Sequence, residues 1–350
     1  MVKIKLLLTF DYELPLGGCS LYSKGLFEPS ESLINLASSK KVKIVLFADI
    51  LSAVVFRNWD NKGYYQPFAE QLNKALSLDH EVQLHLHPHW LNSLYEIGRY
   101  YPSDWKILSK FRNEKPPLNI ESIIDLGIKE LNEICSGHEN YKCTAYRGGG
   151  YNLQPDTDII LKNLYRNGVR YDSSIIKGYY FKSDIQEENF IKMPDKANWY
   201  LPFDGPLNGQ AATGIMEVPI ASKPVSLFFR GKRIYNKIRN KKLYRKLRYD
   251  NHGTGHTGKK TDFTGQIRSF LHAPLVLSFD HLHQELDVLD AILKYQFKIY
   301  RKEKEIALCL NSHPKSLGPY HLRQMEKFLD HIRLKYEGSI EICGYNDLNL

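Results

Sequence analysis

The sequence predicts an α/β protein, a distorted (β/α) barrel of about seven parallel strands with its functional site at the C-terminal rim. Three observations lead to this prediction. Short apolar segments that fit buried strands alternate with longer segments of helical periodicity, which is typical of parallel β/α units. Several of the strand segments end in an ionisable residue, and barrels of this kind carry their chemistry at strand ends. No repeat or linker divides residues 1–350, so we expect one domain; an open, doubly wound sheet is the alternative.

The first half of the chain contains four segments that fit strands and three that fit helices. The strand segments are rich in Val, Ile and Leu, as expected for parallel strands covered on both faces. The expected strands cover 3–10, 42–48, 81–84 and 142–147. The expected helices cover 31–40, 65–78 and 120–135. Ser30 fits the N-cap of the first helix, and the last has a clear apolar stripe.

The second half continues the same alternation with longer connections. Gly168 fits a C-cap that closes a helix over 156–167. Further strands are expected at 169–171, 215–220, 274–279, 306–310 and 340–343, and further helices at 286–301 and 320–336. The count of seven or eight strands favours a closed or nearly closed barrel over an open sheet.

Composition places the chain among ordinary globular proteins. Hydrophobic residues make up 43% and charged residues 25% of the sequence. No segment reaches the roughly 18–20 continuous apolar residues of a membrane span. The apolar start of the chain is interrupted by Asp11 and lacks a small-residue cleavage site, so it fits a first strand better than a signal peptide. Five cysteines without C-x-x-C spacing favour reduced thiols and a cytoplasmic location.

The positive charge of the protein is concentrated in one segment. The formal net charge is +9, and residues 230–248 hold ten Lys or Arg and no acid, within an insertion at about 225–265. One interpretation is an interfacial helix at the inner face of an anionic membrane. Another is a binding surface for a phosphorylated, lipid-linked or nucleotide-linked sugar, and the third is a solvated surface helix. Nucleic acid is not an expected partner, because the remainder of the chain is nearly neutral.

Three histidines follow the expected strand at 81–84. His85, His87 and His89 lie within five residues, and Pro88 ends regular structure among them. Neutral imidazole is the commonest side-chain metal ligand, so the cluster indicates a metal site at a strand end. The alternative is three independent surface histidines in a loop.

Other reactive side chains fall at the ends of other expected strands. They are Asp11, Glu13, Arg147, Asp172 and His313. Together with the histidine cluster they have the composition of a site for metal-assisted hydrolysis. In such a site a divalent ion activates water, a carboxylate acts as general base and a histidine protonates the leaving group. An arginine beside the base keeps its carboxylate charged and oriented.

In this order the motifs resemble a known family. Thr9-Phe10-Asp11, His85-Leu86-His87-Pro88-His89, Arg147 before a tight turn with Tyr151, Asp172-Ser173-Ser174 and His313-Pro314 are similar to motifs of the polysaccharide deacetylase superfamily. This is carbohydrate esterase family 4, with the chitooligosaccharide deacetylase homology domain. The resemblance covers about 6–342. It implies a distorted barrel of seven strands and removal of acetyl groups from N-acetylated sugars with Zn²⁺, or with Ni²⁺ or Co²⁺.

The resemblance also implies a role for each matching residue. Asp11 would be the catalytic base, Arg147 would orient it, and His313 would be the general acid. His85 and His89 would bind the metal, whereas His87 is expected to point away. For substrate binding we expect Tyr151 from the turn after Arg147, Asp172 at a strand end, and Trp90 from the aromatic loop, which could stack on a sugar ring.

Two positions depart from the family pattern. Tyr12 stands where the family has a second, metal-binding aspartate, and Glu13 is the next acid. Residues 11 and 13 share a face of an extended strand, so Glu13 is the expected replacement ligand. The other options are recruitment of His87, binding of the ion by Asp11 itself, or loss of the metal. Three glycines also follow Arg147 where prolines are usual.

We therefore expect a metal-dependent sugar N-deacetylase that acts on a carbon–nitrogen bond other than a peptide bond, in the synthesis of a polysaccharide or glycoconjugate. One alternative is a metal-independent amidohydrolase on a small amide. Another is a carbohydrate-binding protein that has lost turnover.

Overall fold

A curled, mostly parallel sheet forms the centre of the molecule. The computed structural model describes residues 2–17, 19, 21–226, 230–231, 235, 238–247, 263–282 and 285–348. The neighbouring strands of the sheet are, in order, β10 (Trp199–Leu201), β11 (Ile215–Glu217), β7 (Tyr171–Asp172), β6 (Ala145–Gly148), β3 (Glu81–Leu86), β2 (Val45–Asp49), β1 (Lys3–Tyr12) and β14 (Glu305–Ser312). Only the β10–β11 pair among these described strands is antiparallel. β15 (Ile340–Cys343) pairs with residues 4–7 of β1. On the same side of β1, residues 9–12 pair with β2.

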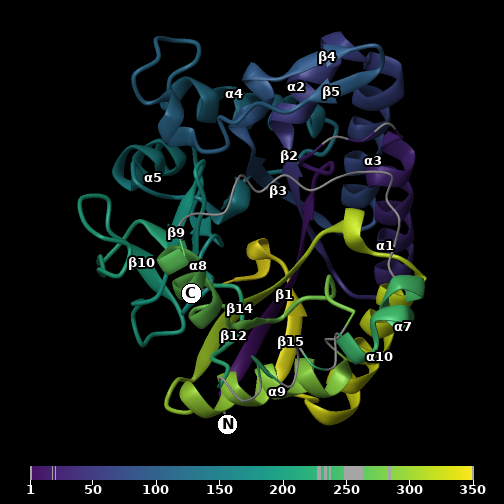
Figure 1. The fold of residues 1–350 in the computed structure, drawn as a ribbon, viewed down its shortest axis with the longest axis vertical. Helices are drawn as coiled ribbons and strands as arrows, with labels where there is room; N and C mark the ends of the chain where they lie inside the picture. The colour runs from purple at the N-terminus through teal and green to yellow at the C-terminus, as the bar shows by residue number, and fades with distance from the viewer. Residues whose placement is uncertain are drawn as a thin grey trace.

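The two ends of this strand path approach each other. An isolated parallel bridge joins Ile220, just after β11, to Cys309 in β14, and a second bridge joins Ile220 to Ile176. The sheet therefore curls into the distorted barrel that the sequence predicts. Figure 1 shows β1 at its centre, beside β14 and β15, with the helices around the outside.

The described helices lie around the sheet, most of them packed on its outer face. They are α1 (Glu28–Ser39), α2 (Ile50–Trp59), α3 (Gln66–Ser77), α4 (Ile120–Ile134), α5 (Thr157–Arg166), α7 (Lys241–Leu247), α8 (Phe263–Leu271), α9 (Leu286–Ile299) and α10 (Pro319–Lys335). Among the described helices, none combines the length and the apolar character needed to cross a bilayer.

Short elements decorate the rim and the connections. Three hairpin-like pairs lie outside the main sheet: β4 (Leu94–Glu96) with β5 (Arg99–Tyr101), β8 (Tyr180–Lys182) with β9 (Glu187–Asn189), and β12 (Ser222–Lys223) with β13 (Leu275–Val276). Single helical turns are η1 (Ser23–Phe27), η2 (Asn61–Tyr65), η3 (Pro88–Asn92), η4 (Leu108–Phe111), η5 (Gly149–Tyr151), η6 (Pro314–Ser316) and η7 (Tyr345–Asp347).

Strand alternation separates two buried layers. In β1 the residues Leu6, Leu8 and Phe10 pack in the large cluster beneath the helices, whereas Leu7 belongs to the smaller cluster inside the barrel. Because successive side chains point to opposite faces, Thr9 and Asp11 continue the inward row toward the C-terminal end of the strand. In β1 the inner face is therefore polar toward the C-terminal end of the strand and apolar at Leu7 below it.

Most expected elements are confirmed, with several corrections. The strand β10 and the helices α2 and α8 were not expected, although the apolar residues of α2 bury it against the sheet. The first helix begins at Glu28, so Ser30 is a buried residue of its first turn and not its cap. The segment at 274–279 contributes only β13, which pairs with β12 outside the main sheet.

Candidate active site

The ends of five barrel strands bring polar side chains together inside the C-terminal rim. In β1, β2, β6 and β14 an apolar inward residue (Leu7, Phe47, Ala145 and Cys309) precedes the polar end residues, whereas the inward row of β3 is polar from Glu81 and Gln83 onward. These end residues are Asp11 and Glu13 from β1, Asp49 from β2, His85 and His87 from β3, Arg147 from β6, and Asn311 and His313 from β14. All are buried except His313, whose side chain is 21% exposed. Among the residues singled out from the sequence, Asp11, Glu13, His85, His87, Arg147 and His313 thus converge on one region.

Arg147 is the fixed centre of this region. Its side chain is fully buried, and all five of its N–H groups are used. Nη1 donates to Oδ1 of Asp11 at 2.7 Å and to Asn311, Nη2 donates to Thr9 and Ser173, and Nε donates to the carbonyl of Ser173. The guanidinium carbon also lies 4.2 Å from the ring centre of Phe47.

The environment of Asp11 keeps it ionised. Burial alone would raise the pKa of this carboxyl, but the Arg147 guanidinium, His85 and His313 hold it well below its ordinary value. Its second oxygen, Oδ2, accepts a bond from Asn311 at 3.4 Å and lies 3.4 Å from Nε2 of His313. Asp11 is therefore an oriented carboxylate with one oxygen facing the open side of the site.

His313 is oriented by Asp280. The backbone N–H of His313 donates to Oδ1 of Asp280 at 2.9 Å, and its Nδ1 lies 2.6 Å from Oδ2. Burial lowers the pKa of the imidazole, but Asp280 and Asp11 outweigh it and raise the pKa to about 10. At neutral pH His313 is thus a cation with its Nε2 proton directed toward Asp11. Asp280 was not chosen as a site residue from the sequence, although it follows an expected strand.

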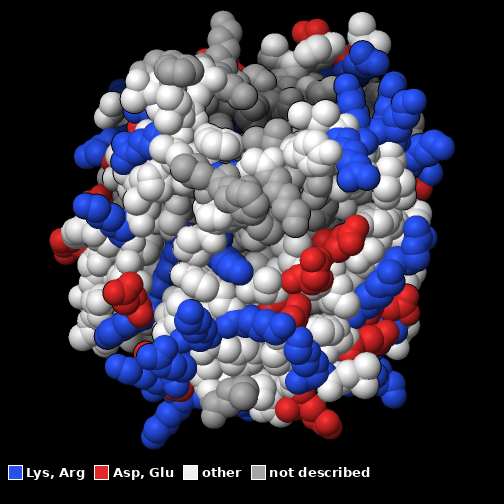
Figure 2. Space-filling model, turned by 60° about the horizontal axis from the view of Figure 1, so that its bottom comes forward, with Lys and Arg blue, Asp and Glu red and all other residues white. Residues whose placement is uncertain are grey.

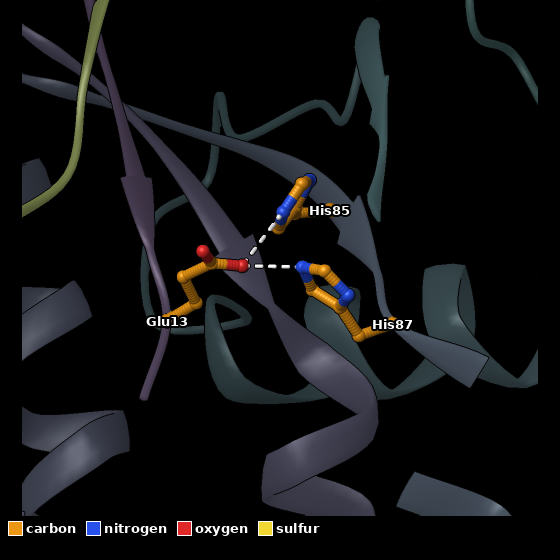
Figure 3. A group of neighbouring side chains, drawn as sticks. All are labelled: Glu13, His85 and His87. Carbon is orange, nitrogen blue, oxygen red and sulfur yellow. Dashed lines mark hydrogen bonds and ion pairs between the residues drawn. The ribbon is translucent and has the colours of Figure 1, made fainter. Parts of the chain in front are cut away.

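Glu13, His85 and His87 form a compact donor group (Figure 3). Their ligand atoms all lie within 4.8 Å of one another, and all three side chains are buried. Nδ1 of His85 is 2.8 Å from the carbonyl oxygen of Arg147 and must donate to it, so Nε2 faces Oε2 of Glu13 at 3.1 Å. Burial lowers the pKa of His85, but Asp11 and Glu13 outweigh this and raise it.

This group fits a divalent metal ion. Two imidazole nitrogens and one carboxylate oxygen are a donor set that Zn²⁺ takes in hydrolases. Nε2 of His87 touches Oε2 of Glu13 in a geometry that is not a hydrogen bond, and this buried nitrogen has no hydrogen-bond partner. Buried polar atoms without hydrogen-bond partners are rare in folded proteins, and an ion held by this group would give this nitrogen a partner besides Glu13.

The histidine pair differs from the expected one. Residues two apart in an extended segment share a face, so His87, with φ −107° and ψ 92°, points to the same side as His85 and not away from it. Pro88 then starts the turn η3, which takes His89 out of this alternation. The ring of His89 packs on Trp90 at 4.8 Å, and His89 is not in the donor group.

Glu13 and Tyr12 point to opposite faces of β1. Tyr12 points outward to the helix layer, where its hydroxyl donates to Gln71 at 2.9 Å, while Glu13 points inward with Asp11. Burial raises the pKa of Glu13, but Lys315, His87 and His85 hold it well below its ordinary value. The structure brings this carboxylate to the two histidines, as the alternation of β1 predicts.

Two of the expected substrate-binding residues, Trp90 and Asp172, are too deeply buried to contact a substrate. Trp90 is fully buried among aromatic rings, and its indole N–H donates to Oδ2 of Asp49 at 2.5 Å. Asp172 is also fully buried and binds the backbone and hydroxyl of Ser174, whose hydroxyl in turn accepts the N–H of Gly148. Both residues support the site from behind, which corrects the expectation that they face a substrate.

Tyr151 is closer to the reacting groups. It adopts a left-handed backbone conformation, φ 64°, in the glycine turn after Arg147. Its hydroxyl accepts a hydrogen bond from Asn311 at 2.8 Å, and burial raises its pKa well above the ordinary value. The phenol therefore keeps its proton and can donate it to a bound oxygen.

Asp49 and Asn311 are site residues that the sequence analysis missed. Asp49 ends β2 beside His85, and its Oδ1 accepts the backbone N–H of His87 at 3.3 Å. Asn311 joins Arg147, Asp11 and Tyr151. The available signal was the same for both: a polar residue in the inward row of an apolar strand.

Comparison with known proteins supports the fold. No protein-family model matches the chain, and no curated protein matches it. A crystal structure provisionally named a polysaccharide deacetylase from Mycobacterium smegmatis aligns with a TM-score of 0.50 and 12% identity, over 99% of this chain and 88% of the other. A second, with an equally provisional name, from Pseudomonas aeruginosa PAO1 aligns with a TM-score of 0.48 and 12% identity over 99% and 89%. The chain thus shares the overall fold of the first of these structures, and at 12% identity the likeness concerns the fold alone.

Proposed function

We propose that the protein is a metal-dependent hydrolase that removes an acetyl group from an N-acetylated sugar. The observation that carries this proposal is the pairing of an ionised Asp11 with a protonated His313 beside the group of Glu13, His85 and His87. A base, an acid and a candidate ion site within one rim are the parts that amide hydrolysis requires.

Glu13, His85 and His87 would hold the divalent cation, for which zinc is the first candidate and nickel or cobalt the others. The bound cation would lower the pKa of water and polarise the acetyl carbonyl. Asp11 would accept the proton of the attacking water through Oδ2, because Oδ1 is held by Arg147. Its low pKa means that it is available as a base throughout the neutral range.

His313 would complete the reaction by donating its Nε2 proton to the departing amine. Asp280 binds the other ring nitrogen, so the ring is held in the orientation that presents Nε2 to the site. The phenol of Tyr151, fixed by Asn311, would donate a hydrogen bond to a substrate oxygen. In this scheme Arg147 positions groups and does not touch the substrate.

Acetate release would test this proposal. The protein loaded with Zn²⁺ would be incubated with N-acetylglucosamine oligomers, beside Asp11→Asn and Lys129→Met, the latter a change at an exposed side chain. We expect acetate from wild type and Lys129→Met, and a loss of about 10²-fold or more for Asp11→Asn. Equal rates for wild type and Asp11→Asn would refute the base assignment.

A metal-independent amidohydrolase is the second candidate, and a specific contact favours it. Nζ of Lys315 donates to Oε1 of Glu13 at 2.5 Å, so this carboxylate already has a positive partner within the chain. Activity on a small amide that persists after exhaustive chelation, with no metal in the protein by elemental analysis, would support this candidate over the first.

The wider setting stays part of the proposal. The substrate would be a sugar of a polysaccharide or glycoconjugate, lipid-linked or nucleotide-linked, in the cytoplasm or at the inner face of the membrane.

Residues 232–234, 236–237 and 248 of the basic segment lie outside the described residues; in α7, Leu243 is 53% exposed among Lys and Arg. Figure 2 shows further Lys and Arg crossing the face near α9. Sedimentation with anionic vesicles, with and without 230–248, would test membrane contact.

A further inference from the structure

The two oxygens of Glu13 have different surroundings. Oε2 faces Nε2 of both His85 and His87, which form the donor group with it. Oε1 faces the opposite way, toward Nζ of Lys315 at 2.5 Å and Nε2 of His313 at 3.6 Å. The buried carboxylate of Glu13 therefore contacts two imidazoles through Oε2 and the ammonium of Lys315 through Oε1.

The position of Lys315 is set by the fold. It lies in η6, two residues after His313, and this turn is closed by bonds from Ser316 N–H to His313 and from Leu317 N–H to Pro314, both 2.9 Å. The lysine side chain is only 14% exposed, and its ammonium also approaches the carbonyl oxygen of Leu14 at 3.4 Å. The ammonium is thus directed into the site and not into solvent.

We propose that Lys315 is a built-in counter-ion of Glu13 that competes with the divalent cation for this carboxylate and keeps metal affinity low. The inference rests on the divalent-cation part of the proposed function. Glu13 is the single carboxylate of the donor group, and its charge is already paired with the ammonium. A divalent ion at Oε2 would also be repelled by that ammonium, and repulsion between charges a few ångströms apart is strong inside a protein.

The pairing also keeps the site assembled without an ion. A buried carboxylate without a partner would be costly, and the Lys315 ammonium supplies a cationic partner for Oε1 of Glu13 at 2.5 Å. The donor group is therefore formed in advance and binds an exchangeable ion, which predicts that purified wild type loses its metal on dialysis.

Zinc affinity tests this inference directly. Zn²⁺ binding would be measured by competition with a chromogenic chelator for wild type, Lys315→Met, Lys315→Arg and Lys129→Met. Lys315→Met removes the charge at similar length and is expected to bind Zn²⁺ at least about tenfold more tightly than wild type. Lys315→Arg keeps the charge and Lys129→Met changes an exposed lysine, so both are expected within about threefold of wild type.

Other outcomes have distinct meanings. Unchanged or weaker Zn²⁺ binding by Lys315→Met, or no binding by any variant, would overturn the inference. Because loss of Lys315 removes the lysine partner of Glu13, folding is checked by melting: Zn²⁺ should raise the melting temperature of Lys315→Met more than that of wild type, and an equal rise would also overturn the inference. If Lys315→Met binds Zn²⁺ more tightly but no variant releases acetate, the inference stands and the proposed reaction is removed. If acetate is released but the Zn²⁺ affinity of Lys315→Met equals that of wild type, the proposed reaction stands and the inference is overturned.

Discussion

The buried pair of Arg147 and Asp11 offers a quantitative test of how the site is held together. Neither Arg147→Met nor Asp11→Asn leaves its partner in water, because the two side chains are 0% and 3% exposed. Breaking a buried ion pair from one side costs about 3–5 kcal/mol, since the remaining charge is uncompensated. Arg147→Met also removes bonds to Thr9, Ser173 and Asn311, so its cost should lie at or above the upper end of this range.

The double variant separates the pair from its surroundings. With both charges removed, no unpaired charge stays buried, so the double variant should be less destabilised than the sum of the singles by about 2–3 kcal/mol. At roughly 2 °C per kcal/mol for a protein of this size, the difference is about 4–6 °C in melting temperature. Thermal melts in zinc-free buffer at pH 7 would measure it. Additive effects, within about 0.5 kcal/mol, would show that the contact does not hold the site.

Three further predictions concern other groups. Asp280→Asn should lower the pKa of His313 from about 10, so that the alkaline limb of the kcat/KM profile moves down by about 1–3 pH units; an unmoved limb would contradict His313 as the acid. Burial raises the pKa of Glu188 to about 8, above its ordinary 4.5, so wild type should lose more stability than Glu188→Gln as pH rises from about 4.5 to 8; parallel melting curves across this window would exclude the effect. His87→Ala should weaken Zn²⁺ binding by about 10²-fold or more, and His89→Ala by much less; the reverse order would restore the pair expected from sequence.

The alternation of side chains along a strand predicts which side chains of the site point inward. In β1 it places Asp11 and Glu13 on the inner face and Tyr12 on the outer face, as expected from the sequence. The same rule, applied to His85 and His87, puts both on one face, and the expectation that His87 points away was wrong for this reason. The position of His89 depends instead on the turn at Pro88, whose direction is set by packing of Trp90 against Asp49.

Burial explains why Trp90 and Asp172 do not have the substrate-binding roles expected from the sequence. Aromatic residues in loops can face a ligand or fill the rim, and composition alone does not distinguish the two. Trp90 fills the rim because Phe56, Trp59 and Tyr100 surround it. Asp172 likewise faces Ser174 because β7 lies behind the glycine turn and not at the open side of the site.

The sequence by itself determined most of the alternation of strands and helices and the shared face of Asp11 and Glu13 in β1. Both depend on local periodicity, which a single segment carries. The candidate roles of Asp11, Arg147 and His313 came from the resemblance of their motifs to a family. Only the tertiary structure decided that Asp280 orients His313, that Asn311 links Arg147 to Tyr151, and that Lys315 shares Glu13 with the histidines. The partners of Arg147 and Glu13 in the completed barrel come from both ends of the chain, 136 and 302 residues away, and no local pattern encodes which of them meet.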